Sequence, residues 1–198
     1  MRLIETGAVP EAALPIEGFR AHLRLGTGFA EEGLQDAVLA GFLRAAIAAI
    51  EARTGKVLLS RGFALELARW RDEMRQTLPV APLVAVTAFE TRDAQGVTTP
   101  VPTGRWRAVA DDARPRIEAL SLALPAIPEG GIARIGFEAG FGPAWADIPA
   151  DLAQATMMLA AHYYEYRHDT ALGPGCMPFG VTALTERFRN LRLSGRGA

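Results

Sequence analysis

The sequence of 198 residues predicts an α+β fold, in which a small antiparallel β unit is inserted into a helical core. Three observations support this prediction. A segment over about residues 31–54 repeats apolar side chains every three or four positions, as one face of a helix does. Segments 63–67 and 133–139 instead alternate their apolar side chains, which is the period of a strand. Helical spacing then returns after Pro149, so that two N-terminal and two C-terminal helices form the core.

The amino-terminal part predicts an extended lead-in followed by two helices. Residues 1–14 contain no clear period. Pro15 suits the first position of a short helix, where its missing N–H costs nothing, and we expect Gly26-Thr27-Gly28 to end that helix. Gly55 is placed to end the long helix in the left-handed conformation.

The middle of the chain predicts several short strands. Strands are expected at 63–67, 83–91, 106–109, 116–120 and 133–139. Residues 92–96 form the turn of a hairpin whose return arm begins at Val97. Pro100 and Pro102 confine that arm to the edge of a sheet, because proline cannot donate a ladder hydrogen bond.

The carboxyl-terminal part predicts two more helices. The helix after Pro149 is apolar around much of its circumference, so it either lies centrally in its domain or packs between subunits. Val181, Leu184, Phe188 and Leu191 form the apolar stripe of the last helix. We expect a single domain over residues 1–198, with the helical core at 15–56 and 149–193, the β insertion at 57–141, a flexible loop at 169–180 and a tail at 194–198.

Composition excludes several classes of protein. The net charge of −1 argues against binding to nucleic acid through bulk electrostatics. Cys176 is the single cysteine, so no internal disulfide is expected and a reducing cytoplasm is the natural place of synthesis. Neither a signal peptide nor an apolar run of about 20 residues, the length of a membrane span, is present in the sequence.

Residues with catalytic or metal-binding chemistry are few. His162, Glu165 and His168 follow one another at three-residue steps, whereas a zinc helix places two histidines four residues apart. Cys176 has no neighbouring base in the sequence that would activate its thiol. We therefore expect no catalytic residue, no metal and no cofactor, and we keep a small metal-dependent hydrolase using those two histidines and Glu165 as the weaker alternative.

Charge and aromatic residues gather near the carboxyl terminus. Four arginines stand against Glu186 in the last helix and tail, a net charge of +3, which suits either a docking surface or a solvated helix face. Three tyrosines, Tyr163, Tyr164 and Tyr166, suit either a protein interface or ordinary core packing.

Several short motifs follow one another in an order and spacing typical of one protein family. They are His22-Leu23-Arg24, Glu51-Ala52-Arg53-Thr54-Gly55, the corner from Leu78 to Leu83, Pro115-Arg116-Ile117, the run from Phe137 to Gly142, Ile148-Pro149, Ala161 to Glu165, and Pro178-Phe179-Gly180-Val181. Over nearly its whole length the chain resembles the head–tail connector, or adaptor, proteins of long-tailed phages, and is most similar to those of gene transfer agents.

The resemblance implies a structural role in the neck of a virion or phage-like particle. Such proteins form a ring on the portal, extend the DNA channel and join the capsid to the stopper or tail, while DNA passes without sequence-specific binding and no membrane is involved. Another neck or tail-completion protein is the nearest alternative.

The resemblance also implies two contact surfaces, which we state as hypotheses. Because the carboxyl-terminal segment is basic, we assign it to the portal and not to the channel wall. The portal-docking residues are Val181, Leu184, Arg187, Phe188, Arg189, Leu191, Arg192 and Arg196. The subunit or partner interface comprises Tyr163, Tyr164, Tyr166 and, in the β unit with its proline-blunted edge, Phe89.

Overall fold

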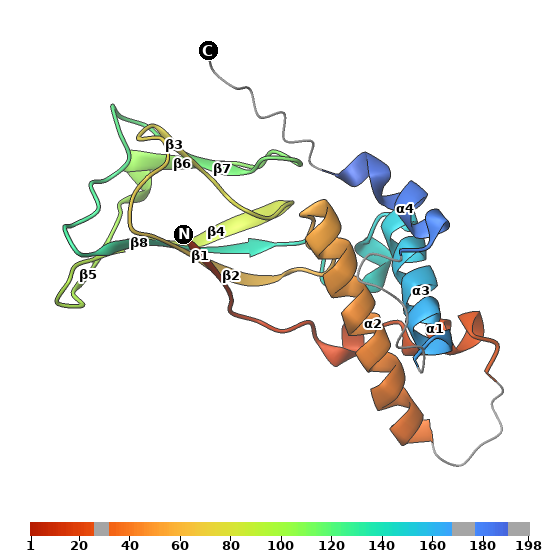
Figure 1. Ribbon diagram of the computed structural model, residues 1–198. Helices are drawn as coiled ribbons and strands as arrows, with labels where there is room; N and C mark the ends of the chain where they lie inside the picture. The colour runs from red at the N-terminus through yellow and green to blue at the C-terminus, as the bar shows by residue number, and fades with distance from the viewer. Residues whose placement is uncertain (26–31, 168–176, 190–198) are drawn as a thin grey trace. The chain divides into compact units, whose positions relative to one another are not determined.

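The strands and helices of this chain separate into two units, each with its own core. The computed structural model describes residues 1–25, 32–167 and 177–189. Unit 1 comprises residues 1–9 and 59–143 and holds the strands; unit 2 comprises residues 10–58 and 144–198 and holds the α-helices (Figure 1). The predicted α+β class is confirmed: after residues 1–9, which belong to the β unit, the chain forms helices, crosses back into the antiparallel β unit at residue 59 and returns to the helical unit at residue 144.

Unit 1 contains two antiparallel sheets. The larger sheet has the order β1-β2-β8-β4-β5, and the smaller has the order β3-β7-β6. The strands of the larger sheet are β1 (Arg2–Glu5), β2 (Arg61–Leu67), β8 (Ile132–Ala139), β4 (Leu83–Arg92) and β5 (Thr98–Pro100). Those of the smaller sheet are β3 (Arg75–Thr77), β7 (Arg116–Ala119) and β6 (Trp106–Val109), and a 3₁₀ turn, η2 (Thr103–Arg105), precedes β6.

The five predicted strands and the hairpin are confirmed within two residues of their expected bounds. At the hairpin turn, Asp93 Oδ1 accepts hydrogen bonds from the backbone N–H of Gln95 (3.0 Å) and of Val97 (2.8 Å). The return arm, β5, is the edge of the larger sheet, as its prolines predicted. Gly140, directly after β8, has φ +142°, and a Cβ there would lie 2.4 Å from Ser60 Cα.

Two strands were missed. Residues 2–5 were expected to be part of an extended lead-in, but they pair with β2, with Leu3 opposite Leu65. β3 is Arg-Gln-Thr, in which Gln76 alone is buried, so its sequence shows no apolar alternation. Both strands are formed by pairing with a distant segment, which local periodicity does not record.

The core of unit 1 is rich in aromatic residues. Phe63 of β2 stacks on Phe137 of β8 with ring centroids 5.6 Å apart. Phe89 lies between Trp70 (5.9 Å) and Trp106 (5.7 Å), both in edge-to-face geometry. Because Phe89 is on β4 and Trp106 on β6, these rings join the two sheets of the unit.

Unit 2 contains four α-helices in its described part: α1 (Ile16–His22), α2 (Glu32–Thr54), α3 (Ala150–Glu165) and α4 (Phe179–Thr185). Short 3₁₀ turns lie at η1 (Glu11–Ala13), η3 (Trp145–Asp147) and η4 (Glu186–Phe188). Pro15 directly precedes α1, one residue before the first helical position that was predicted for it. Pro149 directly precedes α3, and Gly55 ends α2 with φ +69°, both as predicted. The expected stop at Gly26-Thr27-Gly28 lies outside the described residues.

Helix α3 is the centre of unit 2, since it contacts α1, α2 and α4. Its buried residues cover several directions around the axis: Leu152, Ala155, Thr156, Leu159, Ala160 and Ala161. The sequence predicted that this helix lies either centrally in its own domain or between subunits. The burial of α3 within unit 2 confirms the first of these two placements. Within the described residues, no helix combines the length and the apolar character needed to cross a membrane.

The last helix is shorter than its sequence predicted. Helical hydrogen bonding continues over α4 and then tightens into η4, which ends at Phe188. Arg189 has extended backbone angles, with φ −68° and ψ 129°. The predicted loop at 169–180 lies outside the described residues up to position 176, and the tail at 194–198 lies wholly outside them.

Candidate functional site

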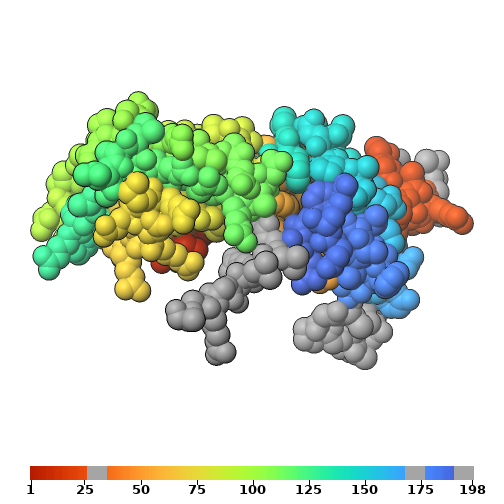
Figure 2. Space-filling model, turned by 90° about the horizontal axis from the view of Figure 1, so that it is seen from above, coloured from red at the N-terminus to blue at the C-terminus, as the bar shows by residue number. Residues whose placement is uncertain are grey.

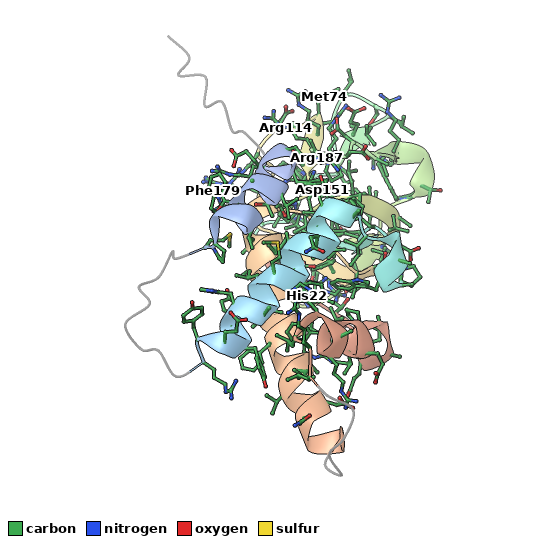
Figure 3. All side chains as sticks on the ribbon, turned by 90° about the vertical axis from the view of Figure 1, so that its right-hand side faces the viewer. His22, Met74, Arg114, Asp151, Phe179 and Arg187 are labelled. Carbon is green, nitrogen blue, oxygen red and sulfur yellow. The ribbon has the colours of Figure 1, made fainter. Side chains whose placement is uncertain are left out.

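The segment predicted to dock on the portal, α4 with η4, packs antiparallel on α3. Near the start of α4, a Cβ added at Gly180 would lie 2.6 Å from Met158 Cε of α3. At the other end, Arg187 Nη2 lies 2.9 Å from Asp151 Oδ2 in the first turn of α3. Figure 3 shows Arg187 and Asp151 close together, with Phe179 at the opposite end of α4, and Figure 2 shows the dark blue segment on the surface.

One side of α4 holds the segment to its own chain. Val181 and Thr185 are fully buried, and the Thr185 hydroxyl donates to the Val181 carbonyl at 2.9 Å. Val181 was assigned to portal docking from the sequence, yet its side chain packs inside unit 2. Its buried side chain therefore holds α4 in place on its own chain.

The other predicted docking residues differ in position. Leu184 and Phe188 are half-buried, and Arg187 and Arg189 are exposed. Leu191, Arg192 and Arg196 lie outside the described residues. The described part of the predicted site is therefore a short helix with a partly apolar, partly charged outer surface.

The charge of this surface is lower than the sequence count of +3 indicated. Arg187 faces Asp151, and Arg189 Nη1 lies 3.1 Å from Glu186 Oε1. The Arg187 guanidinium also lies 4.6 Å from the centre of the Phe188 ring. The two described arginines of the segment are thus balanced by two carboxylates. Sequence reasoning missed Asp151 because this residue is distant in sequence, and its place in the first turn of α3 had a sufficient explanation in the helix dipole.

The three tyrosines of the predicted interface differ in burial: part of the run packs inside unit 2 and part is exposed. Tyr164 contacts Phe42 of α2 edge to face at 5.8 Å, so part of its surface is used within unit 2. Tyr163 is half-buried, and Tyr166 is exposed with its ring 4.7 Å from that of His162. Core packing therefore accounts for part of the tyrosine run, and the interface interpretation stays a prediction for its exposed part.

Phe89, the fourth predicted interface residue, is buried in the core of unit 1. Its ring lies between two tryptophans and presents almost no surface to a partner. The strand alternation of 83–91 did not indicate which face the sheet buries, and the second sheet of the unit covers the face that carries Phe89.

The alternative hydrolase site receives no geometric support from the described residues. Within them, no group of three or more His, Cys, Asp and Glu side chains lies close enough to hold a metal ion. His162 lies against tyrosine rings, while His168 and Cys176 lie outside the described part.

Two carboxylates have shifted pKa values, and both belong to surface ion pairs of unit 1. Hydrogen bonds from Arg116 and then Arg107 hold the pKa of Glu118 below its usual 4.5. The backbone N–H of Met74, followed by the Arg75 side chain, lowers the pKa of Asp72 below its usual 3.8. The lowered pKa values mean that the arginine and backbone partners stabilise the ionised carboxylates, which suits structural ion pairs rather than general acid catalysis.

Comparisons with known proteins show which proteins this chain is similar to. No protein-family model and no curated protein matches it. A chain in the neck of an empty gene transfer agent particle, computed with C6 symmetry, is 59% identical over 98% of both chains, with a TM-score of 0.90. A chain in the virion of a native gene transfer agent particle is 59% identical over the same shares, with a TM-score of 0.87. A third, in a native neck computed with C12 symmetry, is 54% identical over 98% of both chains, with a TM-score of 0.85.

Identity of this degree over the whole chain, together with the same fold, shows common descent and not only a shared architecture. The resemblance to head–tail connectors stated from the sequence motifs is thereby confirmed. The chain belongs to the family of structural neck proteins of gene transfer agent virions.

Proposed function

We propose that this chain is the head–tail adaptor of a gene transfer agent or related phage-like particle. Copies of it form a ring that docks on the portal, extends the DNA channel and joins the capsid to the stopper or tail. The observation that carries the proposal is the identity of 54–59% with neck and virion components over 98% of both chains. Two of those necks were computed with C6 and C12 symmetry, which supports a closed ring.

The final segment is proposed to dock on the portal. Its inner side is held by Val181 and Thr185, so α4 is a fixed support from which the chain continues to its carboxyl terminus. Because Arg187 and Arg189 already face carboxylates, we assign the positive charge used in docking to Arg192 and Arg196. Leu184, Phe188 and Leu191 supply apolar contacts.

Co-sedimentation with the portal protein from the same genetic cluster, followed by electron microscopy, tests the adaptor role. The expected result is a ring stacked coaxially on the portal. A chain that ends at Asn190 is expected to fold and to lose portal binding, and intact binding by that chain contradicts the docking proposal.

A charge variant tests the assignment to the two tail arginines. Arg192→Gln with Arg196→Gln is expected to weaken portal binding and to reduce its dependence on salt. The matched control is Arg92→Gln with Arg105→Gln, which removes the same charge from exposed positions of unit 1. Equal loss in the two variants would mean that net charge, and not the tail, governs binding.

The β unit is proposed to contribute subunit or stopper contacts. Val97, at the β4–β5 hairpin, is 62% exposed and is a better probe of this surface than the buried Phe89. Val97→Asp is expected to impair particle assembly without unfolding the chain. Normal assembly would argue against a contact at this hairpin.

The proposed role is structural and not catalytic. Elemental analysis of the purified chain is expected to find no stoichiometric zinc, and one zinc per chain would favour the hydrolase alternative at His162, Glu165 and His168. The nearest rival, another neck or tail-completion protein, is distinguished by its partner, since it would bind a tail-side component and leave the portal unbound.

A further inference from the structure

Unit 2 carries an apolar groove between the start of α2 and the end of α3. Its volume is about 260 Å³. Val38, on its wall, is 53% exposed, which is high for a large apolar side chain. For scale, an apolar cavity of about 150 Å³ in another protein takes up benzene. The residues that line the groove are Leu25, Gln35, Val38, Leu39, Tyr164 and Arg167.

An aromatic ring and a cation form one end of this groove. Tyr164 is braced by Phe42, and the Arg167 guanidinium lies over the Tyr164 ring at 4.5 Å. Arg167 Nη1 also donates to the Tyr164 carbonyl at 2.9 Å. Among the described residues Arg167 has no carboxylate partner, so the groove combines an apolar floor with a positive rim.

The outer face of α4 has the complementary character. Phe179 is 86% exposed, which is unusual for a phenylalanine and leaves its ring outside the groove of its own chain. Ala183 and Glu186 follow at four and seven positions, on the same side of the segment. This face therefore presents an aromatic ring, a small residue and a carboxylate; Glu186 is exposed and also pairs with Arg189.

We propose that Phe179 of one copy inserts into the groove of the next copy in the ring, with Glu186 approaching the neighbour's Arg167. The inference rests on the proposed ring. A closed ring with cyclic symmetry needs two different, complementary surfaces on each chain, and unit 2 has both. The inserted ring packs on Tyr164 and lies beside the guanidinium of Arg167, where aromatic and cation–π contacts favour it.

Disulfide trapping between two single variants tests the contact. Both variants carry Cys176→Ser, so the native thiol does not react. Phe179→Cys protein is mixed with Val38→Cys protein, assembled on the portal and oxidised. A covalent dimer is expected in the mixture and in neither variant alone. The control mixture pairs Phe179→Cys with Val84→Cys, an equally exposed valine of unit 1, and is expected to give no dimer.

A second measurement does not depend on cysteine chemistry. Phe179→Ala is expected to raise the concentration needed for ring formation on the portal about 10- to 100-fold, the effect of losing one buried aromatic side chain. Leu122→Ala, at a highly exposed residue of unit 1, is the control and is expected to leave that concentration unchanged.

The outcomes separate this inference from the proposed function. If the native chain forms no ring on the portal, the proposed function fails and this contact fails with it. If the native ring forms but the mixture gives no dimer, the contact alone is wrong. A covalent link from position 179 to the portal also overturns it, because Phe179 would then belong to the portal interface.

Discussion

Val181→Ala is the substitution that best tests how the segment proposed to dock on the portal is held to its own chain. Val181 is fully buried, and α4 has seven residues, fewer than an isolated helix needs to be stable in water. The substitution removes two methyl groups, at about 0.8 kcal/mol each for the lost burial, and leaves a small cavity. The local free energy that keeps α4 folded on α3 is therefore expected to fall by about 1.5–3 kcal/mol.

Amide hydrogen exchange measures this local free energy directly. A loss of that size corresponds to exchange about 10- to 100-fold faster at the amides of α4, while the strands of unit 1 keep their protection. The matched control is Val84→Ala, the same chemical change at a valine that is 52% exposed. Exchange in α4 that changes less than about twofold relative to this control would refute the view that burial of Val181 holds the segment.

Three further substitutions test the fold of unit 1. Gly140→Ala is expected to lower the melting temperature strongly, because its Cβ would meet Ser60 backbone atoms at 2.4 Å. Glu118→Gln removes a carboxylate whose pKa is lowered in the folded chain, so its contribution to stability is present above pH 4.5 and is lost as the pH falls below that value. Urea titrations should therefore show that the variant is less stable than the native chain at neutral pH, and that this difference shrinks in acid. Phe89→Asp buries a charge in the aromatic core, so the loss of near-ultraviolet circular dichroism, not a selective assembly defect, is the expected result.

The ion pair of Arg187 and Asp151 shows why counting charges in the sequence overestimates the net charge of the surface proposed to dock. Both side chains are more than one third exposed, so the pair adds little to stability. It nevertheless removes Arg187 from the charge available to a partner. The residues that a docking experiment should address therefore shift toward the carboxyl terminus, to Arg192 and Arg196.

Local periodicity predicted much of the fold. Helix α2, helix α3, the strands with regular alternation and the β4–β5 hairpin all follow from side chains within one short segment, because a helix or a strand that buries one face must repeat its apolar residues at its own period. Pro15, Pro149 and the two prolines near β5 marked boundaries through fixed φ angles and missing donors. Gly55 did so because glycine adopts the left-handed conformation without strain. The order of short motifs was sufficient to identify the family.

Tertiary structure decided what depends on partners distant in the chain. β1 forms because β2 pairs with it, and β3 forms because β7 pairs with it. The sequence of Arg75–Thr77 has no apolar alternation that would predict a strand. Phe89 is a core residue because the second sheet of unit 1 covers the face of the strand that carries it. Val181 is a core residue because α3 packs against its helix, α4. Burial and ion pairing are properties of a pair of segments, so the sequence alone determined which elements form, while their packing determined which side chains are left for a partner.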